Sequence, residues 1–320
     1  MVHSAAISES RAPNELSGSL DHNFKDKRRQ VIKISNLTKK FHSLVALRDV
    51  SMQIRGGDVV GVLGPNGAGK TTLFKLVAGF LFPDAGTISS TSALWPTIGY
   101  KPERLLFPNH LSVGQYLEMV ANLSNISGAT AQQTVGASLE QVDLSYAAEK
   151  RIKDCSKGMR QRLGLAQAMI GNPSLLLLDE PSNGLDPEGQ SDICSQIKTL
   201  NAGGKTIVLA SHQLHEVTQI CTHLIILNRG RIHYENRMAD ALTMRPHTAI
   251  KVNMSLEPLR NLLTGLSPEL EVGEQEITLS NEAMALRRQV LRIVLSAGYD
   301  VTSVKQSRVT LAEIYSEAVQ

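Results

Sequence analysis

Short, continuous runs of apolar residues recur along the first two thirds of the chain. The clearest runs are Val59–Leu63, Leu175–Leu178 and Thr206–Ser211. A run without a polar face is typical of a strand that is buried on both sides of a sheet. Segments with helical spacing separate these runs, so the pattern predicts a parallel α/β sheet whose strands alternate with helices along the chain.

Two further strands are expected before the first buried run, at Val31–Ser35 and Val45–Ile54. The segment from about 104 to 150 consists mainly of predicted helices and lies in the middle of the predicted sheet. We therefore expect one domain over residues 30–245, with a helical subdomain at about 104–170.

Residues 246–320 have a different pattern. Predicted strands and helices follow one another in the order β-α-β-β-α-β, which resembles a split-βαβ sandwich. Thr310 and Glu313 have the spacing of a capping box and predict the start of a last helix. We expect a separate, small α+β domain here. Regulation, support of a dimer and contact with a partner are all compatible with it.

Residues 1–29 are polar and end in a basic cluster, Lys25, Lys27, Arg28 and Arg29. Such a composition favours a disordered leader over an arm that binds a membrane surface or a partner.

Composition narrows the function classes. Lys plus Arg is 33 and Asp plus Glu is 30, for a net charge of +3, and aromatic residues are 4%. These values argue against a strongly cationic nucleic-acid binder and against base-stacking platforms, so no nucleic-acid partner is expected. The three cysteines lack metal-ligand spacing and indicate a reducing compartment. Apolar runs are too short to span a bilayer, so a membrane role would need a partner.

A glycine-rich loop follows the first buried strand and has the pattern G-x-x-x-x-G-K-[ST]. Its glycines let backbone N–H groups surround a phosphate, and the start of the next helix adds a favourable dipole. A lysine supplies a cation to the outer phosphates, and a hydroxyl is placed to bind Mg²⁺. The predicted nucleotide-binding residues here are Gly64, Pro65, Asn66, Gly67, Ala68, Gly69, Lys70, Thr71 and Thr72.

Two acidic residues end the second buried strand. Asp179 is placed to hold Mg²⁺, and Glu180 is a candidate base for the attacking water. Acidic pairs at strand ends are common without any function. The segment Pro181–Pro187 that follows makes the functional interpretation stronger.

Together these motifs resemble the ATP-binding subunit of an ABC transporter over roughly residues 31–235. Ser156, Lys157, Gly158 and Met159 resemble the family signature, and Asp186 matches the D-loop aspartate. His212 matches the switch histidine, although a lone histidine is usually structural. Phe41 lies where the family places an aromatic ring against adenine, although a lone phenylalanine is more often a core residue. Ser156 is also an ordinary helix N-cap, and both interpretations can hold.

The chain departs from the family pattern at several positions. Cys155, Lys157 and Met159 replace the usual residues of the signature, and Glu103 stands where the family usually has Gln. Glu103 can bind Mg²⁺ or can merely line a docking groove. These variants resemble the exporter branch whose membrane subunit is of the ABC-2 type, which serves copper-site maturation, gliding motility and sodium or drug efflux.

The resemblance implies a P-loop fold of ABC type, with a mixed sheet and a helical subdomain, that binds ATP and Mg²⁺ and hydrolyses ATP. It also implies a second copy of the chain, whose signature and D-loop act in trans, and integral membrane permease subunits. Glu103–Phe107 and Val113–Val120 would form the docking groove. The expected location is cytoplasmic, at the inner face of the cell membrane.

Other ATPase classes fit less well. A translation-type ABC protein would normally carry two cassettes, and a chromosome-repair ATPase would carry a long coiled coil between Lys70 and Ser156. A GTPase would need an Asn-Lys-x-Asp motif, which the sequence lacks. A soluble ABC ATPase acting in regulation or assembly stays as the alternative. A binder without hydrolysis would be expected to lose Glu180 or His212.

Overall fold

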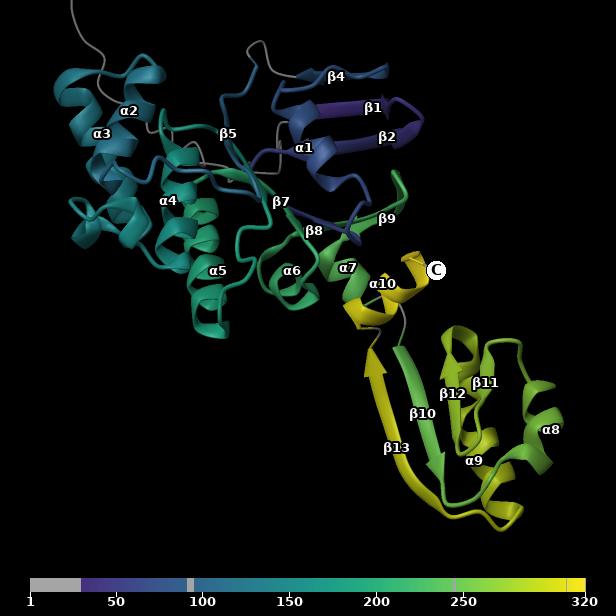
Figure 1. Ribbon diagram of the computed structural model, residues 1–320. Coiled ribbons are helices and arrows are strands. Elements are labelled where there is room, and N and C mark those ends of the chain that lie inside the picture. Colours follow the sequence, from purple (N-terminus) through teal and green to yellow (C-terminus); the bar gives the residue numbers. More distant parts are fainter. Residues whose placement is uncertain (1–29, 91–94, 244–245, 309, 320) are drawn as a thin grey trace, which may run out of the picture.

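The computed structural model describes residues 30–90, 95–243, 246–308 and 310–319. The predicted leader, residues 1–29, lies outside the described residues. We call residues 30–243 together with 310–319 the main body, and residues 246–308 the accessory unit. Figure 1 shows the accessory unit on one side of the main body.

A mixed sheet forms the centre of the main body, with the strand order β5-β6-β7-β3-β8-β9. All neighbouring pairs are parallel except β8 and β9. The strands are β3 (Val59–Leu63), β5 (Ile98–Lys101), β6 (Leu175–Asp179), β7 (Thr206–Ser211), β8 (His223–Asn228) and β9 (Arg231–Arg237). Every residue of β3, β6 and β7 is buried, which confirms the interpretation of the apolar runs.

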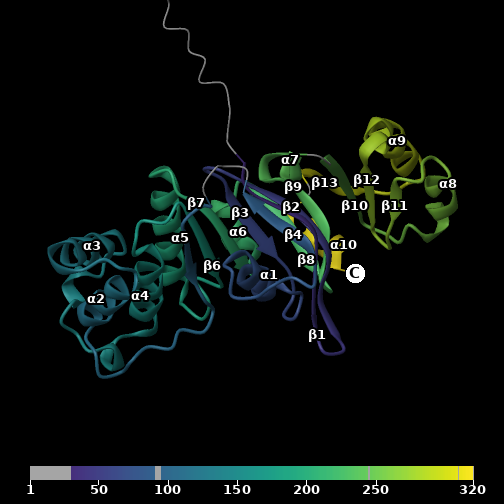
Figure 2. The same cartoon turned by 90° about the horizontal axis from the view of Figure 1, so that it is seen from above.

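A second sheet packs against one face of the mixed sheet. It has the antiparallel order β2-β1-β4, formed by β1 (Gln30–Phe41), β2 (Leu44–Arg55) and β4 (Ala85–Ser90). Helix α1 (Lys70–Val77) lies between the two sheets, and Leu73 and Phe74 fill the core there. Figure 2 shows this layering from above.

Helices cover the other face of the mixed sheet and extend into a helical subdomain. The helices are α2 (Val113–Leu123), α3 (Gly128–Gln141), α4 (Lys157–Met169), α5 (Pro187–Ala202), α6 (Leu214–Ile220) and α7 (Met238–Thr243). Helix α2 begins with a capping box in which Ser112 and Gln115 satisfy each other's backbone N–H groups. Short 3₁₀ turns occur at Ser145–Ala147, Ile152–Asp154, Glu257–Leu259 and Asn281–Leu286.

The accessory unit contains an antiparallel sheet in the order β11-β12-β10-β13. Its elements are β10 (Pro246–Val252), α8 (Arg260–Thr264), β11 (Leu270–Val272), β12 (Glu276–Ser280), α9 (Arg287–Ser296) and β13 (Val301–Arg308). The chain order is therefore β-α-β-β-α-β. Its apolar residues, among them Ile250, Leu279 and Val290, form a core of their own.

The last helix departs from the domain division that we expected. Helix α10 (Leu311–Val319) begins at the predicted capping box, where the Glu313 backbone N–H donates to Thr310 Oγ1 at 3.3 Å. We predicted that this helix belongs to the small domain. Instead, Leu311 and Ile314 are buried in the main-body core, and α10 contacts α6, α7, β8 and β9. Its apolar face matches the main body, because the accessory sheet is already covered by α8 and α9 (Figure 1).

Candidate functional site

A pocket of about 750 Å³ opens at the carboxyl ends of the central strands. Ligand sites of open α/β sheets usually lie at this edge. Most of the predicted nucleotide-binding residues, together with Asp179, Glu180 and His212, line the pocket. The lining residues are Phe41, Leu44, Val45, Ala46, Pro65, Asn66, Gly67, Ala68, Gly69, Lys70, Thr71, Thr72, Glu103, Asp179, Glu180, Asn183, His212, Arg229 and Gly230.

Gly64 is the one predicted loop residue that does not line the pocket. A Cβ atom at this position would collide with the backbone carbonyl of Leu227 on β8. The glycine therefore lets the loop leave β3 close to the neighbouring strand. Its role is backbone packing beneath the pocket.

Lys70 is buried, with 7% of its surface exposed, and lines the pocket. Its Nζ donates to the carbonyl oxygens of Gly64 at 2.7 Å and Pro65 at 3.3 Å, and lies 3.6 Å from Glu180 Oε1. The loop thus holds the ammonium group at the base of the pocket. A phosphate there would meet this cation and the start of helix α1.

Two of the three residues predicted to bind Mg²⁺, Thr71 and Asp179, contact each other. Thr71 Oγ1 donates to Asp179 Oδ2 at 2.7 Å. Asp179 is fully buried, and its Oδ1 atom has no hydrogen-bond partner in the described part of the chain. Burial raises the pKa of Asp179, and the hydrogen bond from Thr71 opposes that shift. A hydroxyl, a carboxylate and an open carboxylate oxygen are the hard oxygen donors that suit Mg²⁺.

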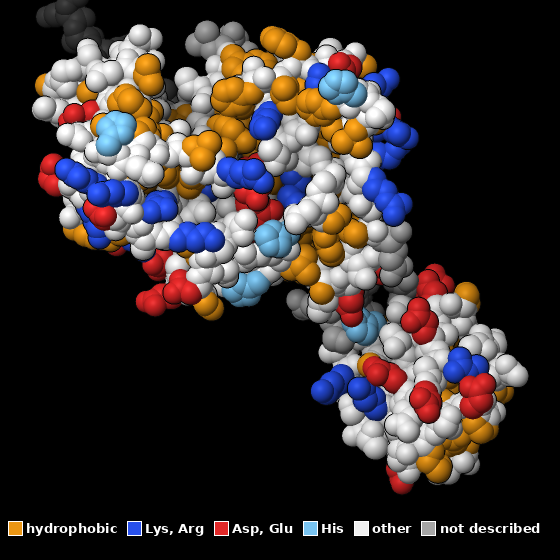
Figure 3. All heavy atoms as spheres, viewed as in Figure 1, with side chains coloured by type: hydrophobic (Ala, Val, Ile, Leu, Met, Phe, Trp, Pro, Cys, Tyr) orange, Lys and Arg blue, Asp and Glu red, His pale blue; other side chains and the backbone are white. Residues whose placement is uncertain are grey.

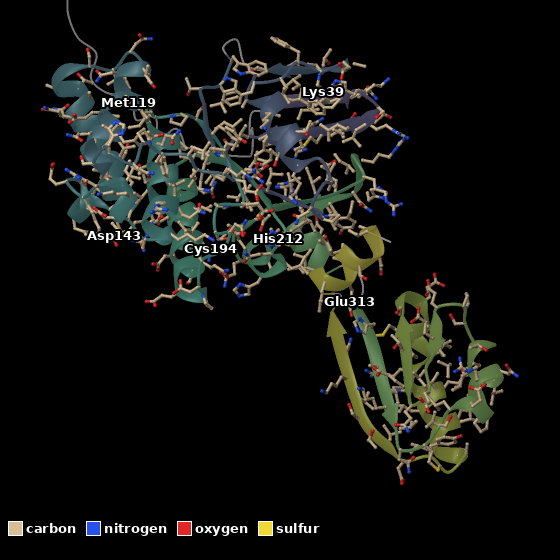
Figure 4. The ribbon with its side chains drawn as sticks, in the orientation of Figure 1. Lys39, Met119, Asp143, Cys194, His212 and Glu313 are labelled. Carbon is tan, nitrogen blue, oxygen red and sulfur yellow. The ribbon has the colours of Figure 1, made fainter. Side chains whose placement is uncertain are left out.

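Glu180 and His212 form a pair at the mouth of the pocket. His212 Nδ1 lies 2.8 Å from Glu180 Oε2, and the imidazole is about half exposed whereas the carboxylate is buried. The Glu180 backbone has φ of 48°, a left-handed conformation that is rare outside glycine. Such strain is frequent at functional sites, and here it turns the carboxylate from β6 towards the pocket. His212 is labelled in Figure 4.

Glu103 follows β5, is exposed, and borders the same pocket. Its carboxylate contributes to the raised pKa of Asp179, after the larger effects of burial and the Thr71 hydrogen bond. The geometry thus brings Glu103 near Asp179, as a role in Mg²⁺ binding requires.

Phe41 lies at the opposite side of the pocket, at the turn between β1 and β2. Its ring is 40% exposed, which excludes the common alternative of a core residue. Lys39 Nζ lies 5.5 Å from the ring centroid. The open ring face at the pocket edge is suited to stacking against a flat ligand.

The predicted signature residues do not line this pocket. Ser156 Oγ caps helix α4 by accepting from the Met159 backbone N–H at 3.2 Å. Asp186 caps helix α5 by accepting from the Gly189 backbone N–H at 3.1 Å. A Cβ atom at Gly184, where φ is 71°, would collide with the Lys157 ammonium group. The signature and the D-loop therefore touch each other, away from the nucleotide-binding residues of the same chain.

Several lining residues were not predicted. Arg229 and Gly230 form the turn between β8 and β9, and the Gly230 backbone N–H donates to the Ala68 carbonyl at 3.0 Å. The apolar run 224–227 followed by an Arg-Gly turn could have revealed them as another strand end at this edge. Asn183 and the segment from Leu44 to Ala46 carry no comparable signal.

Lys101, which lies next to the site, was also not predicted from the sequence. This lysine ends β5 and is only 1% exposed. Burial lowers the pKa of its ammonium group to about 8, and the charges of Asp179 and Glu216 oppose the shift. Glu216 lies on α6 and is itself buried, which raises the pKa of its carboxyl group.

Charged side chains surround the pocket on the surface of the main body. In Figure 3, basic (blue) and acidic (red) side chains gather in the middle of its visible face, near pale blue histidine. Among the described residues, no cluster of three or more His, Cys, Asp or Glu side chains could hold a metal ion by itself. In the same residues, no helix has both the length and the apolar character needed to cross a bilayer.

Comparison with known proteins matches this site to a family. The family model described as "ABC transporter" matches residues 47–183. An uncharacterized ABC transporter ATP-binding protein, YxlF of Bacillus subtilis, is 31% identical over 300 residues, which cover 90% of this chain and 99% of that protein. This chain belongs to the ATP-binding proteins of ABC transporters. It is accordingly an ATP-binding and ATP-hydrolysing subunit of a transporter.

Other ABC relatives carry more specific names. The daunorubicin resistance ATP-binding protein DrrA3 of Streptomyces coeruleorubidus is 30% identical, and the match covers 89% of this chain and 94% of that protein. The Nod factor export ATP-binding protein I of Cupriavidus pinatubonensis is also 30% identical, with 77% and 79% covered.

Solved ABC structures share the P-loop fold but cover less of the chain. The structure of cbiO1 from Clostridium perfringens, part of the ABC transporter complex cbiONQ, has a TM-score of 0.60 and 26% identity. It covers 66% of this chain and 90% of that chain. The sequence match to the Bacillus protein thus extends over much more of this chain than the structural match does.

Proposed function

We propose that this ABC ATPase powers an export system whose membrane subunit is of the ABC-2 type, and that it does so as an ATP-dependent dimer. Two relatives that match most of the chain are named for drug resistance and for export. The variant signature and Glu103 support the same branch. The alternative of a soluble assembly or regulatory ATPase finds no support in the names of these relatives.

The contact between Glu180 and His212 carries the proposed mechanism. Glu180 acts as the base that orients the attacking water, and His212, 2.8 Å away, positions that carboxylate and contacts the outer phosphate. Lys70 binds the outer phosphates from the floor of the pocket. Phe41 stacks against the adenine, and the loop from Pro65 to Thr72 surrounds the phosphates with backbone N–H groups.

Thr71 and Asp179 would hold Mg²⁺, with Glu103 beside them. When bound, the ion neutralises charge that develops on the transferred phosphate. The hydrogen bond between Thr71 and Asp179 keeps both oxygen donors together in the ion's absence. Burial of Asp179 excludes competing water from one side of the carboxylate.

The second copy supplies the missing half of each site. Ser156, Lys157, Gly158, Met159 and Asp186 lie outside the pocket of their own chain, which supports a role in trans. The start of helix α4 is an anion site of the kind that helix N-termini provide. Lys157 is exposed there and adds a positive charge that would face the partner's phosphates.

The membrane subunit would dock on the helical subdomain. A shallow groove along α2 is lined by Leu111, Gln115, Glu118, Met119, Asn122 and Leu123. Leu106 is 91% exposed and Leu123 is 77% exposed, both unusual for large apolar side chains. This arrangement supports a location at the inner face of the membrane, through the partner subunit.

A charge reversal at Lys157 tests the dimer. In K157E the pocket of the same chain is intact, so we expect ATP binding by the monomer to be unchanged. The ATP-dependent dimer should be lost in analytical ultracentrifugation, because the new carboxylate would face phosphates. K153E makes the same charge change on an exposed residue four positions earlier and should dimerise like the unaltered protein. An intact K157E dimer with ATP would overturn the proposed interface.

A further inference from the structure

Lys101 is an unusual side chain for the end of a buried strand. It is among the largest fully buried side chains, and its Nζ has no hydrogen-bond partner within the described residues. Burying an ammonium group destabilises the fold unless nearby groups compensate for the lost water. An apolar side chain would fill the same space without that cost.

The surroundings of Lys101 are rich in carboxylates. Lys101 pairs with Leu178 in the register of β5 and β6, so it lies beside the residue that precedes Asp179. Asp179, Glu216, Glu180 and Glu103 all favour the charged form of this lysine. Acidic groups on or next to β6, on α6 and in the loop after β5 therefore all stabilise the positive charge of Lys101.

Two of these carboxylates have an unused oxygen atom. Asp179 Oδ1 and Glu216 Oε1 are buried and lack hydrogen-bond partners among the described residues. Their other oxygens are bound by hydroxyl groups: Asp179 by Thr71 and Glu216 by Ser211, at 2.7 Å and 2.6 Å. Lys101 Nζ, which is a donor, and these two oxygen atoms, which are acceptors, thus all lack a hydrogen-bond partner within the described residues.

We propose that Lys101 is a positioning residue of the metal site, and that its fixed positive charge balances Asp179 and Glu216 and sets how strongly the site depends on Mg²⁺. The ammonium group is buried at the end of β5, beside the strand that ends in Asp179. It keeps the carboxylates close together before metal arrives and repels the metal after it has bound.

The charge of Lys101 also links the metal site to the segment Ser211–Gln213, which contains His212. Glu216 accepts from Ser211 Oγ, and Ser211 Oγ in turn accepts from the Gln213 backbone N–H at 3.0 Å. Ser211 and Gln213 are the two neighbours of His212 in the chain. Lys101 therefore acts on the position of His212 through Glu216 as well as on Asp179.

The test measures metal dependence without turnover. Binding of the non-hydrolysable analogue AMP-PNP is measured by calorimetry in Mg²⁺ and in EDTA. The dissociation constant in EDTA is divided by that in Mg²⁺, and this ratio is compared between variants. In K101M the site loses its resident cation, so the ratio should rise by about tenfold or more, because one unit charge near a divalent ion acts strongly in a buried site. K101R keeps the charge and should restore the original ratio.

Two further variants make the result decisive. K101Q is neutral but polar and should change the ratio in the same direction as K101M. K205M removes a partly buried lysine that bonds Asn172 and the Pro173 carbonyl and is far along the sequence from the metal site, so its ratio should not change. Unfolding of both neutral variants with normal folding of K101R would also support a required charge. Equal ratios in K101M and the unaltered protein would overturn the proposal.

Discussion

The main body and the accessory unit bury their strands in different ways. Strands β3, β6 and β7 are buried at every position, because layers cover both faces of their sheet. In β12 buried residues alternate with half-buried ones, and Lys251 and Glu276 form an ion pair 3.4 Å apart on the uncovered face. The first pattern leaves only strand ends for polar chemistry, whereas the second displays polar groups along a whole face.

This difference explains where function is concentrated. Asp179 is the last residue of a buried strand, and Glu180 and His212 each directly follow one, so the core of the molecule fixes their positions. Within the described part of the accessory sheet, no acidic or histidine side chain ends a strand that is buried at every position. The ion pair of Lys251 and Glu276 lies on its open face. Changes at the strand ends should therefore alter catalysis, and changes in the accessory unit should alter stability or association.

The largest expected effect is at the proposed base. E180Q keeps the shape of the side chain but removes the charge that orients water, so we expect ATP turnover to fall by about 10²-fold or more. ATP should still bind, and an ATP-bound dimer should accumulate on gel filtration. E188Q, on the exposed first turn of α5, provides the matched control. Turnover close to normal in E180Q would remove Glu180 from this role.

The next effect concerns the floor of the pocket. K70A removes the cation that three oxygen atoms now surround, so we expect ATP affinity to fall about tenfold or more and the ATP-dependent dimer to disappear. Lys75 lies on the same helix but is exposed, and K75A should bind ATP normally in calorimetry. Unchanged nucleotide binding by K70A would contradict the assignment.

A third experiment separates α10 from the rest of the accessory region. Leu311 and Ile314 belong to the main-body core, so L311A and I314A should each destabilise the main body by about 2–5 kcal/mol. A chain ending near Arg245 should expose apolar surface and aggregate. A chain in which a short linker replaces residues 246–308 keeps α10 and should stay folded and bind ATP. Thermal unfolding and dye binding distinguish these outcomes.

The smallest expected effect is at Glu103. E103Q removes a charge beside the phosphates, so metal-free ATP binding should strengthen several-fold, with a smaller change for ATP in the presence of Mg²⁺. The Mg²⁺ requirement should fall, opposite to the direction expected for K101M. Equal shifts with and without Mg²⁺, or no shift, would leave Glu103 as a residue of the docking groove.

Much of the main body could be predicted from local pattern. Continuous apolar runs predict β3, β6 and β7, and motif spacing predicts that Lys70, Thr71 and Asp179 lie at one edge of the sheet. The β-α-β-β-α-β order of the accessory region could also be predicted from the sequence, because apolar residues recur with different periods in strands and in amphipathic helices.

What could not be predicted depends on packing across the chain. Burial of Lys101 is invisible in the sequence, where a lysine between Tyr100 and Pro102 suggests a solvated strand end. Arg229 enters the pocket only because β8 lies beside β3 in the sheet. The sequence predicts that helix α10 has an apolar face. It does not indicate whether that face packs into the core of the main body or into that of the accessory unit.

The return of α10 has a consequence for biosynthesis. A growing chain emerges from its amino end, and domains generally fold as they are completed. Here helix α10, which packs on α6 and α7, is translated only after the whole accessory unit, which has its own core. The apolar groove of the nucleotide-binding part on α6 and α7 therefore stays uncovered during synthesis, until the accessory unit and then α10 have left the ribosome.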